Sequence, residues 1–216
     1  MTVPRFASVI LDVDSTLCGI EGIDWLAARR GPDVAAEIAR LTERAMDGAI
    51  ALDAVYGERL AIVRPRAAEV AELARAYADA LAPGAREAIF RMRGEGVVLA
   101  LVSGGIQQAI RPLARELGFP DASLHAVSIS FDASGVFSDY DALSPLATQH
   151  GKKDVARSLN LARPSLAVGD GATDAAMREV TDAFAAFTGF ARREPVVRAA
   201  DYVVSSFDEL RNLVLP

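Results

Sequence analysis

Cysteine and histidine are scarce in this sequence, which has one Cys and two His among 216 residues. A single cysteine excludes an internal disulfide framework and any metal site built from several thiolates. His125 and His150 have no partner pattern around them, so we expect both to be structural or surface residues. Thiol and imidazole chemistry is therefore not the expected basis of function.

Long apolar runs and an excess of positive charge are missing as well. The most apolar stretch, 97–102, is too short to cross a membrane. The N-terminal segment carries one arginine and reaches two carboxylates by Asp14, which is not the pattern of a signal peptide. With 23 basic and 29 acidic side chains, the formal charge of -6 argues against nucleic-acid affinity. We expect neither a membrane nor a nucleic-acid partner, and the cytoplasm is the expected compartment.

The chain does have the composition and the pattern of an α/β protein. Hydrophobic residues make up 51% and charged residues 24%, as in ordinary globular domains. A buried strand is expected at 8–14, helices over 23–81, and alternating strands and helices from there to the C-terminus. We expect the later strands at 97–102, 126–131, 136–140, 165–168, 183–187 and 202–204, with a helix starting at 103–105. The prediction is a parallel-sheet domain interrupted by a helical insertion.

Carboxylates gather where two of the expected strands end. Asp12 and Asp14 point to the same side of an extended strand, about 7 Å apart, and Asp170 and Asp174 follow the strand at 165–168. Ligands of open parallel sheets lie beyond the carboxyl ends of the strands, so these acids should share one crevice. Like charges held together need a compensating cation, and Mg²⁺ suits such oxygen ligands.

A hydroxyl and a lysine complete a set of groups that could bind and transfer a phosphoryl group. Asp12 would attack phosphorus, and Asp14 would protonate the leaving alkoxide and later activate water. Ser103 would hydrogen-bond the phosphoryl oxygens, and Lys152 would balance the charge. Asp170 would hold Mg²⁺ together with Asp12, while Asp174 would support the metal waters or orient Lys152.

These motifs resemble those of the haloacid-dehalogenase-like phosphatases. The resemblance rests on Asp-Val-Asp-Ser-Thr at 12–16, Ser-Gly-Gly at 103–105, the lysine at 152 and Gly-Asp-Gly-Ala-Thr-Asp at 169–174. Segments around 21–24, 45–48 and 58–61 are similar to the phosphoserine phosphatase family in particular. The resemblance implies a Rossmann-like core at 1–18 and 82–216, with a small helical cap at 19–81 inserted after the first strand.

The resemblance also implies roles for single residues. The backbone carbonyl of Asp14 would be a further Mg²⁺ ligand beside Asp12 and Asp170, and Glu21 and Arg59 would hold the amino and carboxylate ends of phosphoserine. A guanidinium can bind a carboxylate through two hydrogen bonds, which agrees with that role. The remaining substrate-binding positions that it implies are Met46, at the substrate stem, and Ser103, Gly104, Gly105 and Thr173.

The expected activity is Mg²⁺-dependent hydrolysis of O-phosphoserine through an aspartyl-phosphate, the last step of serine biosynthesis, by a monomer or homodimer. Phosphoethanolamine or phosphohomoserine are alternative substrates, phosphate transfer to an alcohol is an alternative reaction, and a phospho-accepting receiver module is an alternative class. Sequence leaves open the choice between Lys152 and Lys153, and the roles of Asp47, Cys18 and Arg193.

Overall fold

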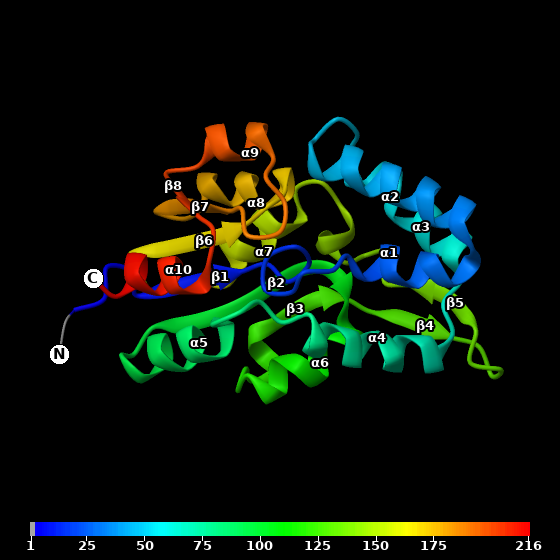
Figure 1. The fold of residues 1–216 in the computed structure, drawn as a ribbon, viewed down its shortest axis with the longest axis horizontal. Coiled ribbons are helices and arrows are strands. Elements are labelled where there is room, and N and C mark those ends of the chain that lie inside the picture. The colour runs from blue at the N-terminus through cyan, green and yellow to red at the C-terminus, as the bar shows by residue number, and fades with distance from the viewer. Residues whose placement is uncertain (1–2) are drawn as a thin grey trace.

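The structure is a computed structural model that describes residues 3–216, and a six-stranded parallel sheet forms its centre (Figure 1). The strand order is β3-β2-β1-β6-β7-β8, so β1 lies in the middle of the sheet between β2 and β6. The strands are β1 (Ser8–Leu11), β2 (Val98–Ile106), β3 (Leu124–Val127), β6 (Ser165–Gly169), β7 (Ala183–Phe187) and β8 (Tyr202–Val204). Every residue of β1, β6 and β7 is buried, which explains their continuous apolar runs.

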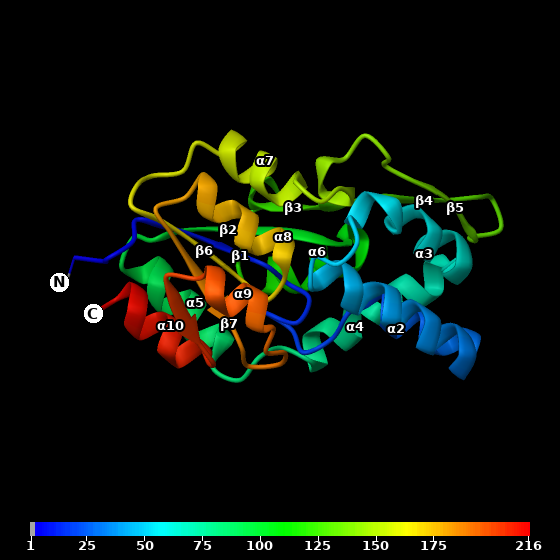
Figure 2. The ribbon, with the colours of Figure 1, turned by 90° about the horizontal axis from the view of Figure 1, so that it is seen from above.

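Helices cover both faces of this sheet (Figures 1 and 2). One face carries α5 (Ala85–Gly94), α6 (Gln107–Glu116) and α10 (Phe207–Val214), and α5 packs against α10. The other face carries α7 (Gly151–Ser158), α8 (Ala172–Ala175) and α9 (Glu194–Ala199). The α/β fold class expected from the sequence is confirmed.

Four helices lie between β1 and α5 and are called the helical insertion below. They are α1 (Gly22–Ala27), α2 (Pro32–Met46), α3 (Tyr56–Val63) and α4 (Ala67–Asp79). Figures 1 and 2 place α1, α2 and α3 beyond one end of the sheet, whereas α4 packs against α6 of the main domain. Short 3-10 helices occur at Ala28–Arg30, Leu52–Ala54, Asp121–Ser123, Pro145–Ala147 and Ala176–Glu179.

Three expected elements are corrected by the structure. The strand expected at 8–14 ends at Leu11, so Asp12 and Asp14 lie in the turn that follows it and not on one side of an extended strand. The strand expected to end at residue 102 runs on through 103–105 to Ile106, and α6 begins only at Gln107. Ile106 is fully buried and pairs with Val127 of β3, so sheet pairing overrides the breaking tendency of the two glycines. The expected strand 126–131 is in fact two strands, because β3 ends at Val127 and a separate strand follows.

That separate strand forms a hairpin with its successor. β4 (Ile129–Phe131) pairs antiparallel with β5 (Phe137–Tyr140). The hairpin is hydrogen-bonded to the helical insertion, since Phe137 N donates to Pro65 O and Ala67 N donates to Gly135 O, at 2.9 and 2.8 Å. The hairpin and the insertion are therefore joined, although they are far apart in the sequence.

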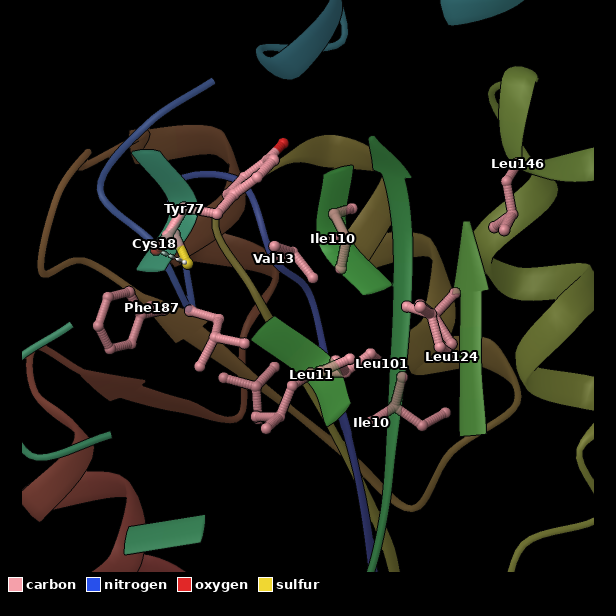
Figure 3. Packing of buried hydrophobic residues seen from close by; sticks show 14 of the residues in the cluster. Ile10, Leu11, Val13, Cys18, Tyr77, Leu101, Ile110, Leu124, Leu146 and Phe187 are labelled. Atoms are coloured by element: carbon pink, nitrogen blue, oxygen red, sulfur yellow. Dashed lines mark hydrogen bonds between the residues drawn. The ribbon is translucent and has the colours of Figure 1, made fainter. Parts of the chain in front are cut away.

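The core is continuous from the sheet into the insertion. Figure 3 shows residues of β1, β2, β3 and α6 packed together, among them Ile10, Leu101, Leu124 and Ile110. Tyr77 of α4 belongs to the same cluster. Between residues 3 and 216, no helix combines the length and the apolar character needed to span a membrane.

Candidate active site

The acidic motifs meet at the carboxyl edge of the sheet because of the strand register. Leu11 of β1 is aligned with Leu101 of β2 and Val168 of β6, and Asp12 N donates to Val168 O at 3.0 Å. Ser103 and Asp170 each lie two residues beyond those partners. The chain therefore brings Asp12, Ser103 and Asp170 to one edge, as expected for an open parallel sheet.

A pocket of about 450 Å³, partly open to solvent, lies between this edge and the helical insertion. All of the residues expected to be catalytic or to bind substrate line it. They are Asp12, Asp14, Glu21, Met46, Arg59, Ser103, Gly104, Gly105, Lys152 and Thr173. Asp170 and Asp174 lie beside Asp12, immediately behind the lining. The structure thus brings together all twelve positions singled out in the sequence.

Lys152 occupies the acidic end of the pocket. Its Nζ lies 2.7 Å from Asp12 Oδ1 and 2.8 Å from Asp174 Oδ1, and all three side chains are buried. Burial alone would lower the pKa of Lys152, but the two carboxylates raise it above its usual range, so the ammonium is charged. The adjacent Lys153 instead pairs with the exposed Glu179 at 3.1 Å. The choice between the two lysines, open in the sequence, is settled in terms of position: Lys152 is the one in the pocket.

Three carboxylates converge closely enough to share a cation. Asp12, Asp170 and Asp174 each offer an oxygen, and these oxygens lie within 4.8 Å of one another. Burial and the charge of Asp174 raise the pKa of Asp12 to about 7. Burial and Asp12 also raise the pKa of Asp170 well above its usual value. Three buried carboxylates held this close together repel one another unless a cation compensates them, and a hard divalent cation with oxygen ligands fits this donor set.

The Asp14 carboxyl group accepts hydrogen bonds from two groups of the helical insertion. Its Oδ1 accepts a hydrogen bond from Tyr77 Oη at 2.6 Å, and its Oδ2 accepts one from Gly22 N at 3.0 Å. Desolvation raises the pKa of Asp14, and the two hydrogen bonds oppose that rise. The carboxyl is therefore held at the boundary between the sheet and the insertion.

Hydroxyl and amide groups surround the space next to Asp12. Gly105 N donates to Ser103 Oγ at 3.0 Å, so the Ser103 hydroxyl proton remains free to donate. Thr173 Oγ1 is buried and has no hydrogen-bond partner among the residues that the structure describes. A Cβ built on Gly171 would lie 3.0 Å from Met46 Sδ, which places Met46 beside this loop. The arrangement is suited to receive an oxyanion.

The segment between β1 and α5 contributes an arginine and a glutamate to the pocket. Arg59 is 4% exposed, and its Nη1 donates to Thr42 Oγ1 at 2.7 Å, which in turn donates to Asp24 Oδ1 at 2.6 Å. Glu21 Oε1 accepts a hydrogen bond from Ser15 Oγ at 2.6 Å. Burial and the neighbouring Asp14 raise the pKa of Glu21 to about 8. A ligand with a carboxylate and an ammonium would satisfy both groups.

Some site residues were not found from the sequence. Ile23, Leu52 and Tyr56 add an apolar wall to the pocket, and Tyr56 Oη donates to Gly104 O at 2.8 Å. Thr16 Oγ1 donates to Asp170 Oδ1 at 3.2 Å. Thr16 and Ile23 fall inside the segments 12–16 and 21–24 that carry the resemblance, but no role was assigned to them. Leu52 and Tyr56 have side chains that predict ordinary packing, so no sequence signal distinguished them.

The sequence left the roles of Arg193, Asp47 and Cys18 open. In the structure the first two lie beside each other, and Cys18 is buried. Arg193 is buried against the site, with Nη1 3.0 Å from Asp170 Oδ2 and its guanidinium 3.7 Å from the exposed Asp47 of the insertion. Cys18 is buried and its thiol donates to Tyr77 O at 3.3 Å. Burial raises the pKa of Cys18 above its usual range, which agrees with a packing role.

Residues 9–179 match the haloacid dehalogenase-like hydrolase family, a match that covers most of the chain. The chain belongs to this family. Among the relatives of this hydrolase, the mouse (Mus musculus) phosphoserine phosphatase is 34% identical over 206 residues, which cover 94% of this chain and 91% of that one. The chloroplastic phosphoserine phosphatase of Arabidopsis thaliana is 33% identical, over 95% of this chain and 70% of that one.

Solved structures agree with this family assignment. A phosphoserine phosphohydrolase-like protein from Francisella tularensis has a TM-score of 0.88 at 27% identity, covering 95% of this hydrolase and 98% of that chain. A substrate-bound phosphoserine phosphatase has a TM-score of 0.80 at 22% identity, over 97% and 99% of the two chains. At that identity the second match shows a shared fold.

Proposed function

We propose that this hydrolase is a Mg²⁺-dependent phosphomonoesterase that converts O-phosphoserine to serine and phosphate. One observation carries the proposal: a single pocket is lined both by Asp12 and Lys152 at the edge of the sheet and by Glu21 and Arg59 from the segment between β1 and α5. In this proposal, 1–18 and 82–216 form the catalytic core and 19–81 the cap. Residues 1 and 2 of that core lie outside the described part of the chain.

Asp12 is the proposed nucleophile. One of its oxygens forms a bond to phosphorus while the bond from phosphorus to the serine oxygen breaks, which gives an aspartyl-phosphate. Asp14 transfers its proton to the departing serine oxygen. Asp14 then takes a proton from water, the water oxygen attacks phosphorus, and the phosphorus–Asp12 bond breaks to release phosphate. Lys152 stays protonated throughout and stabilises negative charge on Asp12 and the phosphoryl oxygens.

Mg²⁺ would be held by the carboxylates of Asp12 and Asp170 and the backbone carbonyl of Asp14, with Asp174 behind them. When bound, it neutralises charge on the phosphoryl group and on these acids. Asp174 also accepts hydrogen bonds from Lys152 and from Gly171 N, at 2.8 and 3.0 Å, and so orients the lysine.

The substrate ends are recognised by the insertion. Arg59 would take the carboxylate of phosphoserine, and Glu21 would take its ammonium, whose positive charge favours the ionised form of Glu21. Met46 would pack on the short stem. The phosphoryl group would lie against Ser103, Gly104, Gly105 and Thr173.

Phosphate release from a panel of phosphomonoesters tests this function. The panel contains O-phospho-L-serine, phosphoethanolamine and phosphohomoserine, with Mg²⁺ or EDTA, and compares wild type with Asp12→Asn. We expect turnover to be strongest on phosphoserine, to need Mg²⁺ and to be lost in the variant. Preference for another ester would refute the substrate, and rapid phosphate turnover itself would exclude a receiver module.

Water is the proposed acceptor of the phosphoryl group. Equal amounts of serine and inorganic phosphate are expected, whereas transfer to an alcohol would release serine with less phosphate. The activity would provide the last step of serine biosynthesis in the cytoplasm, by a monomer or homodimer acting on a small-molecule substrate.

A further inference from the structure

Two donors from the helical insertion hold the Asp14 carboxyl group. The Tyr77 hydroxyl of α4 contacts Oδ1 at 2.6 Å, and the Gly22 amide of α1 contacts Oδ2 at 3.0 Å. Val70, Leu73 and Tyr77 recur at helical spacing, a pattern that by itself predicts Tyr77 only as a core residue. Its ring does pack in the core, but its hydroxyl reaches the site.

Tyr77 is held rigidly. Its side chain is fully buried, and the Cys18 thiol donates to its backbone carbonyl at 3.3 Å. Figure 3 shows the ring beside Cys18, with the hydroxyl pointing away from the sulfur. The helix that carries Tyr77, α4, packs against α6 of the main domain. The hydroxyl is therefore fixed relative to the sheet as well as to the insertion.

The neighbouring backbone leaves space for this contact. A Cβ built on Gly22 would overlap the Tyr77 hydroxyl, so a larger residue at position 22 would displace it. The absence of a side chain at 22 thus allows two donors to reach one carboxyl group. Tyr77 and Gly22 form one arrangement, built around Asp14.

Proton transfer depends on how that carboxyl group is oriented. Each carboxyl oxygen has two lone pairs, so Asp14 can accept both hydrogen bonds and still carry a proton toward the pocket. Without Tyr77, rotation of the carboxyl is restrained by Gly22 alone, and fewer encounters have the geometry for transfer. We infer that Tyr77 is a positioning residue that orients Asp14 toward the leaving oxygen of the substrate, an inference that rests on the proposed function.

Tyr77→Phe tests this role, because it removes the hydroxyl and keeps the ring. We expect kcat for O-phosphoserine to fall about 10- to 100-fold, with KM within about twofold, since Tyr77 contacts Asp14 and not the substrate. A purely structural role would loosen the insertion and raise KM. A raised KM with unchanged kcat, or no change in either, would overturn the inference.

The leaving group provides a second readout. kcat/KM covers the steps up to departure of the leaving group, and p-nitrophenolate departs without needing a proton. We therefore expect Tyr77→Phe to change kcat/KM for p-nitrophenyl phosphate less than about threefold. Equal losses on this ester and on phosphoserine would contradict a role through Asp14.

Tyr56→Phe is the matched control. It removes another buried tyrosine hydroxyl of the insertion, one that donates to Gly104 O and not to Asp14. It should lower kcat/KM for the two esters by similar factors. Failure of the proposed function would be recognised separately, as a wild type that releases no phosphate from phosphoserine, whereas failure of this inference would leave an active wild type and an equally active Tyr77→Phe.

Discussion

Lys152 and its neighbours show how single residues set up the pocket. One ammonium lies within 2.8 Å of two buried carboxylates, Asp12 and Asp174. Removal of a buried partner leaves the opposite charge uncompensated, which is costly in a shielded site. The position of this one lysine therefore affects both Asp12, the proposed nucleophile, and Asp174.

Lys152→Met should lower kcat for phosphoserine about 100- to 1000-fold, because charge developing in the transition state loses its nearest ammonium. Lys153→Met is the control, since Lys153 pairs with the exposed Glu179, and it should stay within about twofold of wild type. Steady-state phosphate release measures both. A large loss in Lys153→Met with little loss in Lys152→Met would reverse the assignment.

At this scale the sequence predicts the residues that follow strands and misses those defined by tertiary hydrogen bonds. Asp12 and Asp170 could be predicted because each carboxylate comes directly after an apolar strand. Lys152 and Lys153 could not be separated, since neighbouring helical residues differ by about 100° in direction and only the packed structure says which one faces inward. The contact between the Tyr77 hydroxyl and Asp14 could not be predicted, because an aromatic ring at this position of an apolar helical stripe already fits a core role.

At the scale of elements, the β4–β5 hairpin supports the insertion from a distant part of the sequence. The rings of Tyr140 on β5 and Tyr56 on α3 are 5.4 Å apart, and Tyr56 also bonds to Gly104. The hairpin therefore helps to place the wall of the pocket. Local sequence patterns predict strands at 126–131 and 136–140, of which the first is divided between β3 and β4 in the structure. They do not predict the contact between the hairpin and the insertion, because hydrogen bonds such as Ala67 N to Gly135 O join distant segments.

Tyr140→Ala should raise KM for phosphoserine about 3- to 10-fold and lower the free energy of unfolding by about 1–3 kcal/mol, because Tyr56 loses its aromatic partner. Ser138→Ala, at an exposed position of the same strand, is the control and should change stability by less than about 0.5 kcal/mol. Kinetics and denaturant unfolding test this. Indistinguishable variants would mean that the hairpin does not support the pocket.

β2 shows why glycines misled the boundary prediction. Ser103-Gly104-Gly105 has the composition of a turn, yet the strand continues because Ile106 pairs with Val127 and is buried. Tertiary pairing outweighed local preference. Ser103, Gly104 and Gly105, the proposed phosphoryl-binding residues, therefore lie on a strand rather than at the start of a helix.

At the scale of the whole molecule, the buried carboxylates of the pocket make stability depend on pH. The pKa of Asp12 rises from 3.8 to about 7, and that of Glu21 from 4.5 to about 8, so the folded protein holds protons that the unfolded chain releases. This contribution to stability is present below pH 4 and is lost as pH rises through the folded pKa values.

In EDTA, the free energy of unfolding should therefore fall between about pH 5 and pH 8. Saturating Mg²⁺ should raise stability most at pH 8, because it binds the folded protein and replaces the missing positive charge. Asp12→Asn should flatten the decline. Urea unfolding across this range measures it, and a metal-free protein whose stability rises from pH 5 to pH 8 would contradict this view of the site.

The proposed recognition of a phosphorylated amino acid depends on Arg59, so Arg59→Ala is the decisive variant. The measurement is KM for O-phospho-L-serine and for phosphoethanolamine, which lacks the carboxylate, with Arg40→Ala as the control at an exposed arginine of α2. We predict that KM for phosphoserine rises about 10- to 100-fold in Arg59→Ala while KM for phosphoethanolamine stays within about threefold. Arg40→Ala should match wild type on both. Equal effects of Arg59→Ala on the two substrates would contradict recognition of the substrate carboxylate by Arg59.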